Sequence, residues 1–308
     1  LSAEGDVLAP TSWARRRELG VELPFLALQR WGQLLERNRV AGPFTLAAAT
    51  LLGGDLGLAA TPIAPEGGWI AGLLKSLGIE LSRHDRPTRV KICDFAPGDA
   101  PDAIADAMLA ELAADRPEVE VALGGGRRRI VRIVDEPVEG LPRSELRRGA
   151  VWVVTGGARG ITAEVSLALG RQYGLDLHLI GRSPTPRDDA PWRNVSDDDL
   201  KTIKRSIVRQ AVAEGKSPEK QWDRVKHDIE IHDNLARMRR LGLRVAYHSC
   251  DVADWTALAK TLDAIRRSSG PIEGIIHGAG YARTSRFESQ KREELIATIR
   301  AKVDGAVA

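Results

Sequence analysis

The feature that most constrains the fold is an apolar segment followed at once by a glycine-rich turn, Val151-Trp-Val-Val-Thr-Gly-Gly-Ala-Arg-Gly-Ile-Thr-Ala-Glu164. The apolar residues predict a buried strand, and the glycines let the backbone turn sharply and present its N–H groups. A helix that begins near Thr162 would direct the positive end of its dipole at this turn, which favours a bound phosphate. The turn departs from G-x-G-x-x-G, because Gly157 comes early and the last glycine is absent. A tight strand-to-helix turn without a ligand is the alternative.

Composition sets the class of protein. A chain of 308 residues, 43% hydrophobic and 28% charged, is long enough for two domains and ordinary for a soluble protein. The net charge of +3 gives no case for a nucleic-acid partner. Cys93 and Cys250 stand far apart, so we expect neither a disulfide framework nor a metal site. With no apolar run of membrane-spanning length and no signal pattern, we expect a cytoplasmic protein without membrane contact. Both ends of the sequence read as cut, which favours an excised part of a longer chain.

The second half of the chain has a regular pattern after a linker at about 135–143. Strands alternate with helices, which predicts a doubly wound parallel sheet. About sixty residues between Gly181 and Leu243 exceed what one crossover helix needs. They predict a helical insert at about 184–241, whose dense charges are typical of a solvated surface. A contact with a carrier protein or another domain stays open. The strands are expected at 151–155, 177–180, 243–248 and 272–276, and the other helices at 162–173, 255–267 and from about 289 onward.

The first half also has strand and helix character, but no glycine turn that enters a helix. Helices are expected at 26–35, 69–79 and 101–114, and strands at 44–51 and 89–95. The segments 119–122 and 129–134 are interpreted as a hairpin-like pair around Gly124-Gly-Gly126, which favours a hairpin loop over a binding loop.

The end of the second strand of the sheet indicates which dinucleotide is bound. An acid there would accept from the ribose hydroxyl of NAD, whereas an arginine accommodates the 2′-phosphate of NADP. Here Gly181-Arg182-Ser183 follows the strand, and no acid comes before Asp188. Arg159, inside the glycine turn, supplies a second positive charge for the same phosphate. These residues predict NADP(H), with a plain surface arginine as the alternative for Arg182.

The later strands end in further candidate residues. Asp251 could reach the adenine edge or cap the next helix, although Asp254 is better placed for the cap. The small residues of His277-Gly-Ala-Gly280 let the backbone approach a ribose or nicotinamide closely. His277 has no acid, Cys or second His beside it, so packing is favoured over catalysis or metal binding.

Five motifs, in this order, resemble the ketoreductase domain of type I polyketide synthases. They are Thr155-Gly-Gly-Ala-Arg-Gly160, Gly181-Arg-Ser183, Cys250-Asp-Val252, His277-Gly-Ala-Gly280 and Ala301-Lys-Val-Asp-Gly305. The turn ending in Ile161-Thr162 and the charged insert look closest to ketoreductases of polyunsaturated fatty acid synthases. The resemblance implies two Rossmann-like subdomains: a degenerate structural one at 1–145 that binds no cofactor, and an NADPH-binding catalytic one at 146–308, truncated at its C-terminus.

The resemblance also implies an activity. It is hydride transfer from NADPH to a β-ketoacyl thioester on an acyl carrier protein, among neighbouring synthase domains. In the family a Tyr protonates the alkoxide, a Ser binds the ketone oxygen and a Lys lowers the pKa of the Tyr. Lys302 matches the Lys, with a solvated helix lysine as the alternative, whereas the Ser and Tyr fall beyond it. The implied cofactor-binding residues are Thr155, Gly156, Gly157, Arg159, Gly160, Ile161, Arg182, Ser183, Asp251, Val252, His277, Gly278, Ala279 and Gly280.

Two rival functions stay open. One is a non-catalytic ketoreductase-like scaffold within a multidomain synthase. This hypothesis is consistent with the three tyrosines, none of which gives Tyr-x-x-x-Lys or Tyr-x-x-x-Asn. The intact nucleotide motifs argue against it, because a scaffold needs neither Arg182 nor an open glycine turn. The other is an NADP-dependent short-chain enzyme acting on a free metabolite. It is disfavoured because such enzymes lack the family's structural subdomain, which the segments Pro65-Glu-Gly-Gly-Trp-Ile-Ala-Gly-Leu-Leu-Lys-Ser76 and Gly126-Arg-Arg-Arg-Ile-Val-Arg132 resemble.

Overall fold

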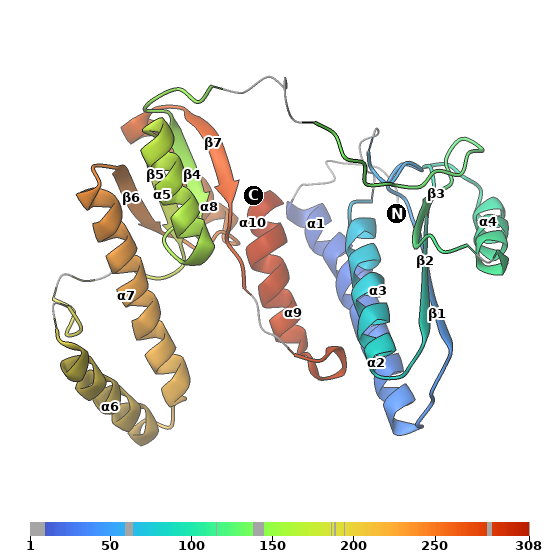
Figure 1. Ribbon diagram of the computed structural model, residues 1–308, viewed down its shortest axis with the longest axis horizontal. Helices are drawn as coiled ribbons and strands as arrows, with labels where there is room; N and C mark the ends of the chain where they lie inside the picture. The colour runs from blue at the N-terminus through green and yellow to red at the C-terminus, as the bar shows by residue number, and fades with distance from the viewer. Residues whose placement is uncertain are drawn as a thin grey trace. The chain divides into compact units, whose positions relative to one another are not determined.

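A computed structural model describes residues 10–58, 64–114, 116–137, 145–185, 187, 189–193, 195–281 and 285–307. The chain divides into two compact units, Leu1–Gly140 with Thr284–Arg292, and Leu141–Arg283 with Glu293–Ala308. Figure 1 labels the elements of both. The return of the segment 284–292 to the first unit was not anticipated by the limits 1–145 and 146–308.

The first unit is built on a small parallel sheet of order β1-β2-β3. The predicted hairpin-like pair around the triple glycine is present, but it is reduced to one bridge in which Ala122 and Arg129 exchange two backbone hydrogen bonds of 2.9 Å. The third strand runs parallel to the second, and the residues after it add only one antiparallel bridge, from Arg129 to Ala122. A strand of three residues offers too short an edge for a full hairpin. The elements are α1 (Pro10–Arg17), a π-helical turn (Glu18–Glu22), α2 (Leu23–Arg37), β1 (Phe44–Thr50), α3 (Glu66–Arg83), β2 (Thr88–Asp94), α4 (Pro101–Ala113), β3 (Glu120–Ala122) and a 3₁₀ turn (Phe287–Ser289).

The 3₁₀ turn is held to the first unit by specific contacts. The ring of Phe287 packs edge-on against Phe25, with centroids 5.0 Å apart, and both rings are buried. Gln29 donates from its amide nitrogen to the carbonyl oxygens of Phe287 and Gln290, at 2.9 and 2.7 Å. Arg292, the last residue of the segment, donates to the buried Glu22 carboxylate at 2.6 Å. Phe287 is therefore part of the core of this unit, and the hydrogen bonds of its neighbours anchor the turn to it.

The second unit contains a four-stranded sheet of order β6-β5-β4-β7, in which all the strands are parallel. Helices cover both faces. Residues of α5 and α7 pack on one face around Val154 and Leu177, and α8 packs on the other around Val153 and Ile180. The predicted α/β fold with doubly wound sheet is confirmed. The elements are β4 (Val151–Thr155), α5 (Gly160–Tyr173), β5 (Asp176–Gly181), α6 (Asp197–Ala213), α7 (Pro218–Arg240), β6 (Arg244–Ser249), α8 (Trp255–Ser269), β7 (Ile272–His277), α9 (Arg292–Ile299), a π-helical turn (Arg300–Asp304) and α10 (Gly305–Val307).

The charged insert contains a core helix. Ile231, Leu235 and Met238 of α7 are at most 3% exposed and belong to the same hydrophobic cluster as α5. Their i, i+4, i+7 spacing places them on one helical face. The interpretation of this segment as a solvated surface is therefore wrong for the second half of α7, which is the crossover helix between β5 and β6. Among the described helices none is both long and apolar enough to cross a membrane.

Candidate cofactor site

The glycine turn lies directly against the loop that follows β7. Gly156 has φ +72°, and a Cβ there would stand 2.7 Å from the carbonyl oxygen of Gly278. Its N–H donates to the Ile180 carbonyl at 2.7 Å. A Cβ on Gly157 would collide with Val154 Cγ1 at 2.8 Å. The turn thus needs glycine at both positions, and it stands where the strand order reverses, the usual place of a ligand in open α/β sheets.

A hydrogen-bonded chain joins the ends of β4 and β7. The Nε2 of His277 faces the carbonyl oxygen of Lys302 at 3.1 Å and must donate to it, which leaves Nδ1 as an acceptor. The Thr155 hydroxyl, 2.9 Å away, donates to Nδ1 and itself accepts the N–H of Ala279 at 3.1 Å. Both ring nitrogens of His277 are therefore used to fix the loop and the C-terminal helical turn. This agrees with a packing role.

Thr162 stands where a glycine would complete the dinucleotide pattern, and its side chain fills space that Gly278 leaves open. A Cβ on Gly278 would lie 2.5 Å from Thr162 Cγ2 and 2.6 Å from Oγ1. The side chain gained at one position is matched by the side chain missing at the other. The departure from the glycine pattern is therefore accommodated within the site.

An acid from α7 reaches the glycine turn. Glu230 accepts the N–H of Gly160 at Oε1, at 2.8 Å, and the Nε–H of Arg159 at Oε2, at 3.0 Å. Partial burial opposes ionisation of this carboxyl, but the two hydrogen bonds outweigh it and lower its pKa, so the group is charged at neutral pH. Asn234, one turn further along α7, donates to the carbonyl of Ala158 at 3.0 Å.

Arg182 and Ser183 lie at the carboxyl end of β5, as predicted. Arg182 is exposed and makes no ion pair among the described residues. The carbonyl of Ser183 accepts the Tyr247 hydroxyl at 2.8 Å. Burial, and next the Asp228 carboxylate, raise the pKa of Tyr247 to about 12, so this hydroxyl stays a donor. No described contact joins Arg182 to Arg159.

Asp251 and Val252 follow β6 and turn the chain into α8. The Asp251 carboxylate accepts the N–H of Ala253 at 3.0 Å, whereas Asp254 caps the helix by accepting from Ala257. The capping role that the sequence favoured for Asp254 is confirmed. Val252 is buried, and a Cβ on Gly305 would stand 2.6 Å from its Cγ2, so the two segments are in close contact.

Lys302 is brought to the end of β7. Its Cε lies 3.4 Å from where a Cβ on Gly280 would stand, and the residue is exposed. The ammonium group makes no ion pair within the described part of the chain. Lys302, Gly280, His277 and Thr155 thus gather at one edge of the sheet. Ile161, 85% exposed, stands in the first turn of α5.

Sequence reasoning missed Glu230, Asn234 and Tyr247. Glu230 and Asn234 are four residues apart on α7, a spacing that places them on one face, but the charges around them resemble a solvated helix. The sequence signal around Tyr247 bears only on a catalytic role, because it lies in the residue four positions later, Asp251. In the described residues no cluster of three His, Cys, Asp or Glu side chains could hold a metal ion.

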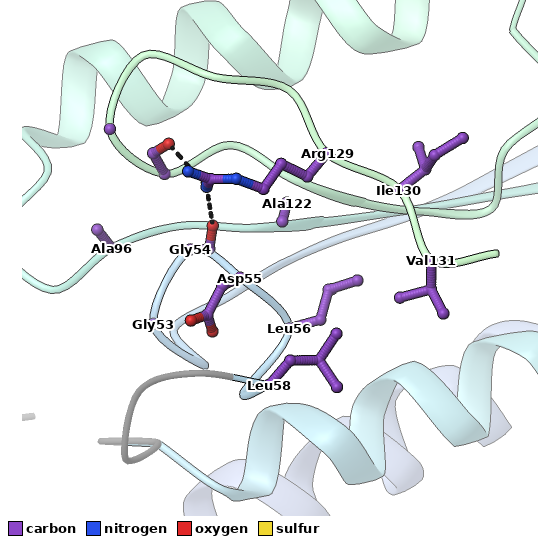
Figure 2. A pocket seen from close by; sticks show the side chains of 12 residues that line it. Gly53, Gly54, Asp55, Leu56, Leu58, Ala96, Ala122, Arg129, Ile130 and Val131 are labelled. Atoms are coloured by element: carbon purple, nitrogen blue, oxygen red, sulfur yellow. Dashed lines mark hydrogen bonds between the residues drawn. The ribbon is translucent and has the colours of Figure 1, made fainter.

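These residues fit a nicotinamide dinucleotide. The glycine turn excludes side chains at its closest approach to the β7 loop, α5 directs its positive end at the turn, and Arg159 and Arg182 supply positive charge. The first unit offers a weaker candidate, a cavity of about 540 Å³ between the loops at Gly53–Leu58 and Gly124–Gly125. Figure 2 shows Arg129 reaching across these loops, where it donates to the carbonyls of Gly54 and Gly124. The three strands there follow one another without a reversal of order, so no crevice of the dinucleotide type forms.

Comparison with known proteins assigns the second unit to a protein family. A family model described as KR domain matches residues 150–308. The chain is 31% identical over 252 residues to a polyunsaturated fatty acid synthase polypeptide of Thraustochytrium sp., covering 77% of this chain and 9% of that protein. It is 26% identical over 245 residues to erythronolide synthase EryA3 of Saccharopolyspora erythraea, covering 80% of this chain and 6% of that protein. The chain thus spans a small part of these relatives.

Solved structures share the fold. A ketoreductase domain from the bacillaene assembly line has a TM-score of 0.63 at 20% identity, covering 93% of this chain and 55% of that one. The structure of A-type ketoreductases from a modular polyketide synthase gives 0.61 at 22% identity, with 92% and 50% covered.

Proposed function

This chain belongs to the KR domain family, and we propose that it binds NADPH and takes part in reducing a β-ketoacyl thioester, carried on an acyl carrier protein, to the β-hydroxyacyl thioester within a polyketide or fatty acid synthase. The observation that supports this most is the convergence of the glycine turn, the His277–Gly280 loop and Lys302 at the carboxyl ends of β4 and β7. NADPH, when bound, supplies the hydride.

The residues of the chain bind and orient the cofactor. Arg159 and Arg182 hold the 2′-phosphate, and the first turn of α5 faces the pyrophosphate. Thr155 and His277 fix the β7 loop, in which Gly278 packs against Thr162 of the glycine turn and Gly280 leaves room for the nicotinamide ribose. Lys302 places a positive charge beside this loop, where negative charge develops on the reduced ketone. Asp251 and Val252 border the adenine.

Titration of NADPH and NADH, followed by cofactor fluorescence, tests the site. We expect NADPH to bind more tightly than NADH. Arg182→Ala should weaken the affinity for NADPH by about tenfold or more and leave the affinity for NADH nearly unchanged, because a hydrogen bond to a charged group contributes about 1.5–3 kcal/mol. Arg187→Ala, which removes an exposed arginine paired with Asp189, is the matched control. Equal affinity for the two cofactors would refute the role of Arg182.

A non-catalytic scaffold is the second candidate. Tyr173, Tyr247 and Tyr281 are followed four positions later by Leu177, Asp251 and Ser285, so none forms the tyrosine motif of the family. The same titration separates the candidates, because a scaffold needs no nucleotide site and should not bind NADPH; NADPH consumption is recorded in parallel with a carrier-bound β-ketoacyl substrate. Binding without consumption by these 308 residues is the expected result. Consumption would show that a proton donor lies among them.

A further inference from the structure

The carboxylate of Glu230 occupies the part of the glycine turn that the proposed function assigns to a phosphate. One oxygen accepts the N–H of Gly160, the first residue of α5, and the other accepts the Nε–H of Arg159. A negative oxygen at a helix N-terminus, with a second on a guanidinium, is the arrangement in which proteins bind phosphate groups. Two of the groups expected to hold the cofactor are thus already engaged by an internal anion.

Helix α7 holds Glu230 in place. The next residue, Ile231, is 2% exposed and packs in the core of the unit. One turn on, Asn234 donates to the carbonyl of Ala158 in the glycine turn, and Arg237 pairs with Glu164 of α5 at 2.5 Å. Glu230, Asn234 and Arg237 therefore form one polar helical face along the turn and the start of α5 (Figure 1 shows both helices).

The contact itself is weak enough to be exchanged. The side chains of Arg159 and Glu230 are 38% and 40% exposed, and ion pairs of this kind contribute little to stability. Rotation of the Glu230 side chain would free Arg159 without unpacking Ile231. A 2′-phosphate carries more charge than a carboxylate and offers more acceptor oxygens, so it competes effectively for the same guanidinium.

We propose that Glu230 is an internal competitor for the cofactor's 2′-phosphate, and that it sets the affinity and the nucleotide preference of the site. This proposal rests on the proposed NADPH-binding function. NADPH exchanges the Glu230–Arg159 pair for a phosphate–Arg159 pair, whereas NADH has a hydroxyl at that position and leaves the pair intact. When oxidised cofactor departs, Glu230 takes back Arg159.

The test compares wild type with Glu230→Gln, which keeps the shape of the side chain and removes its charge. Dissociation constants are measured by calorimetry for NADPH, NADH, and the fragments 2′,5′-ADP and 5′-AMP, so that no turnover is needed. We expect NADPH and 2′,5′-ADP to bind about three- to tenfold more tightly to the variant. This factor corresponds to the free energy of an exposed ion pair and a helix N-terminal contact, which the phosphate no longer has to displace. NADH and 5′-AMP should tighten less, by about twofold at most, because their phosphates can reach the N–H of Gly160 at the helix N-terminus but neither brings a phosphate to Arg159.

Glu164→Gln is the matched control, because it removes the other acid that pairs between α5 and α7 and should leave all four constants unchanged. Unchanged NADPH affinity in Glu230→Gln would overturn the proposal, and weaker affinity would show instead that Glu230 orients Arg159 toward the phosphate. If Glu230→Gln fails to fold, Glu230→Asp, whose shorter side chain retreats from Arg159, should show the same direction with a smaller change. If wild type and variants all fail to bind NADPH, the proposed function fails together with the competitor role.

Discussion

The side chain of Thr162 occupies the space beside Gly278, and this contact predicts an energetic coupling between the two positions. In Gly278→Ala the new Cβ would stand 2.5 and 2.6 Å from the γ atoms of Thr162, and 3.0 Å from the carbonyl oxygen of Thr155. All three distances are shorter than ordinary van der Waals contact. The two γ contacts disappear in Thr162→Ala, whereas the contact with the Thr155 oxygen stays.

The size of the effect follows from these contacts. Overpacking of this kind costs about 1–3 kcal/mol. Thr162→Ala alone should change the free energy of unfolding little, because lost packing is offset by the higher helix propensity of alanine, about 0.5 kcal/mol. In the double variant the remaining contact with Thr155 accounts for only part of the cost. We therefore expect a coupling free energy of about 1–2 kcal/mol between the two positions.

A double-mutant cycle measures this coupling. Urea unfolding of wild type, the two single variants and the double variant gives their free energies of unfolding. Hydrogen exchange of the β4 amides reports on the stability of the second unit separately. Gly280→Ala is the control in the same loop, because among the described residues its Cβ would meet only the Lys302 side chain, at Cε and 3.4 Å. It should stay within about 0.5 kcal/mol of wild type. If Gly278→Ala costs as much with alanine at position 162 as with threonine, the two side chains do not share this space and the reasoning fails.

Two further predictions concern stability. His178 and His248 stack, with Nδ1 and Nε2 2.9 Å apart, and burial lowers the pKa of both below the usual value of about 6.5. The unfolded chain then binds protons more readily than the folded one, so the free energy of unfolding should fall as pH decreases through about 6.5. In urea titrations at a series of pH values, this fall should be smaller for His248→Gln than for wild type. In the first unit the fully buried Asp94 accepts the Thr50 hydroxyl and the N–H groups of Leu52 and Leu56. Asp94→Ala leaves these donors without a partner and should cost about 3 kcal/mol or more in urea unfolding, whereas Asp94→Asn, which keeps one acceptor oxygen, should cost less.

The parts of the fold that the sequence predicts are those with a local signature. The strand before Gly156 is apolar throughout, and the helices around it keep a regular spacing, so the sheet and its helices were expected where they lie. The capping role of Asp254 was also readable, because the residue stands directly before a periodic helix. The expected pairing of 119–122 with 129–134 extends over one bridge only, because periodicity does not report how long a neighbouring edge strand is.

Contacts between residues far apart in the sequence cannot be predicted from local patterns. The bond from Gly160 to Glu230 spans 70 residues, and no local pattern distinguishes this glutamate from the other acids of α7. The buried face of α7 was present in the spacing of Ile231, Leu235 and Met238, but the density of charge hid it. The assignment of Phe287 to the first unit depends on a partner, Phe25, that is far away in the sequence.

The position of Phe287 has a consequence for exchanging parts between members of the KR domain family. A recombination breakpoint between Gly140 and Leu141 would take Phe25 and Gln29 from one parent and Phe287 and Gln290 from the other. The chimera would inherit mismatched halves of a single core, even though the breakpoint lies at a domain boundary. A chimera that takes residues 284–292 from the same parent as residues 1–140 keeps the Phe25–Phe287 pair and the Glu22–Arg292 hydrogen bond. This short segment should therefore be exchanged together with the first unit.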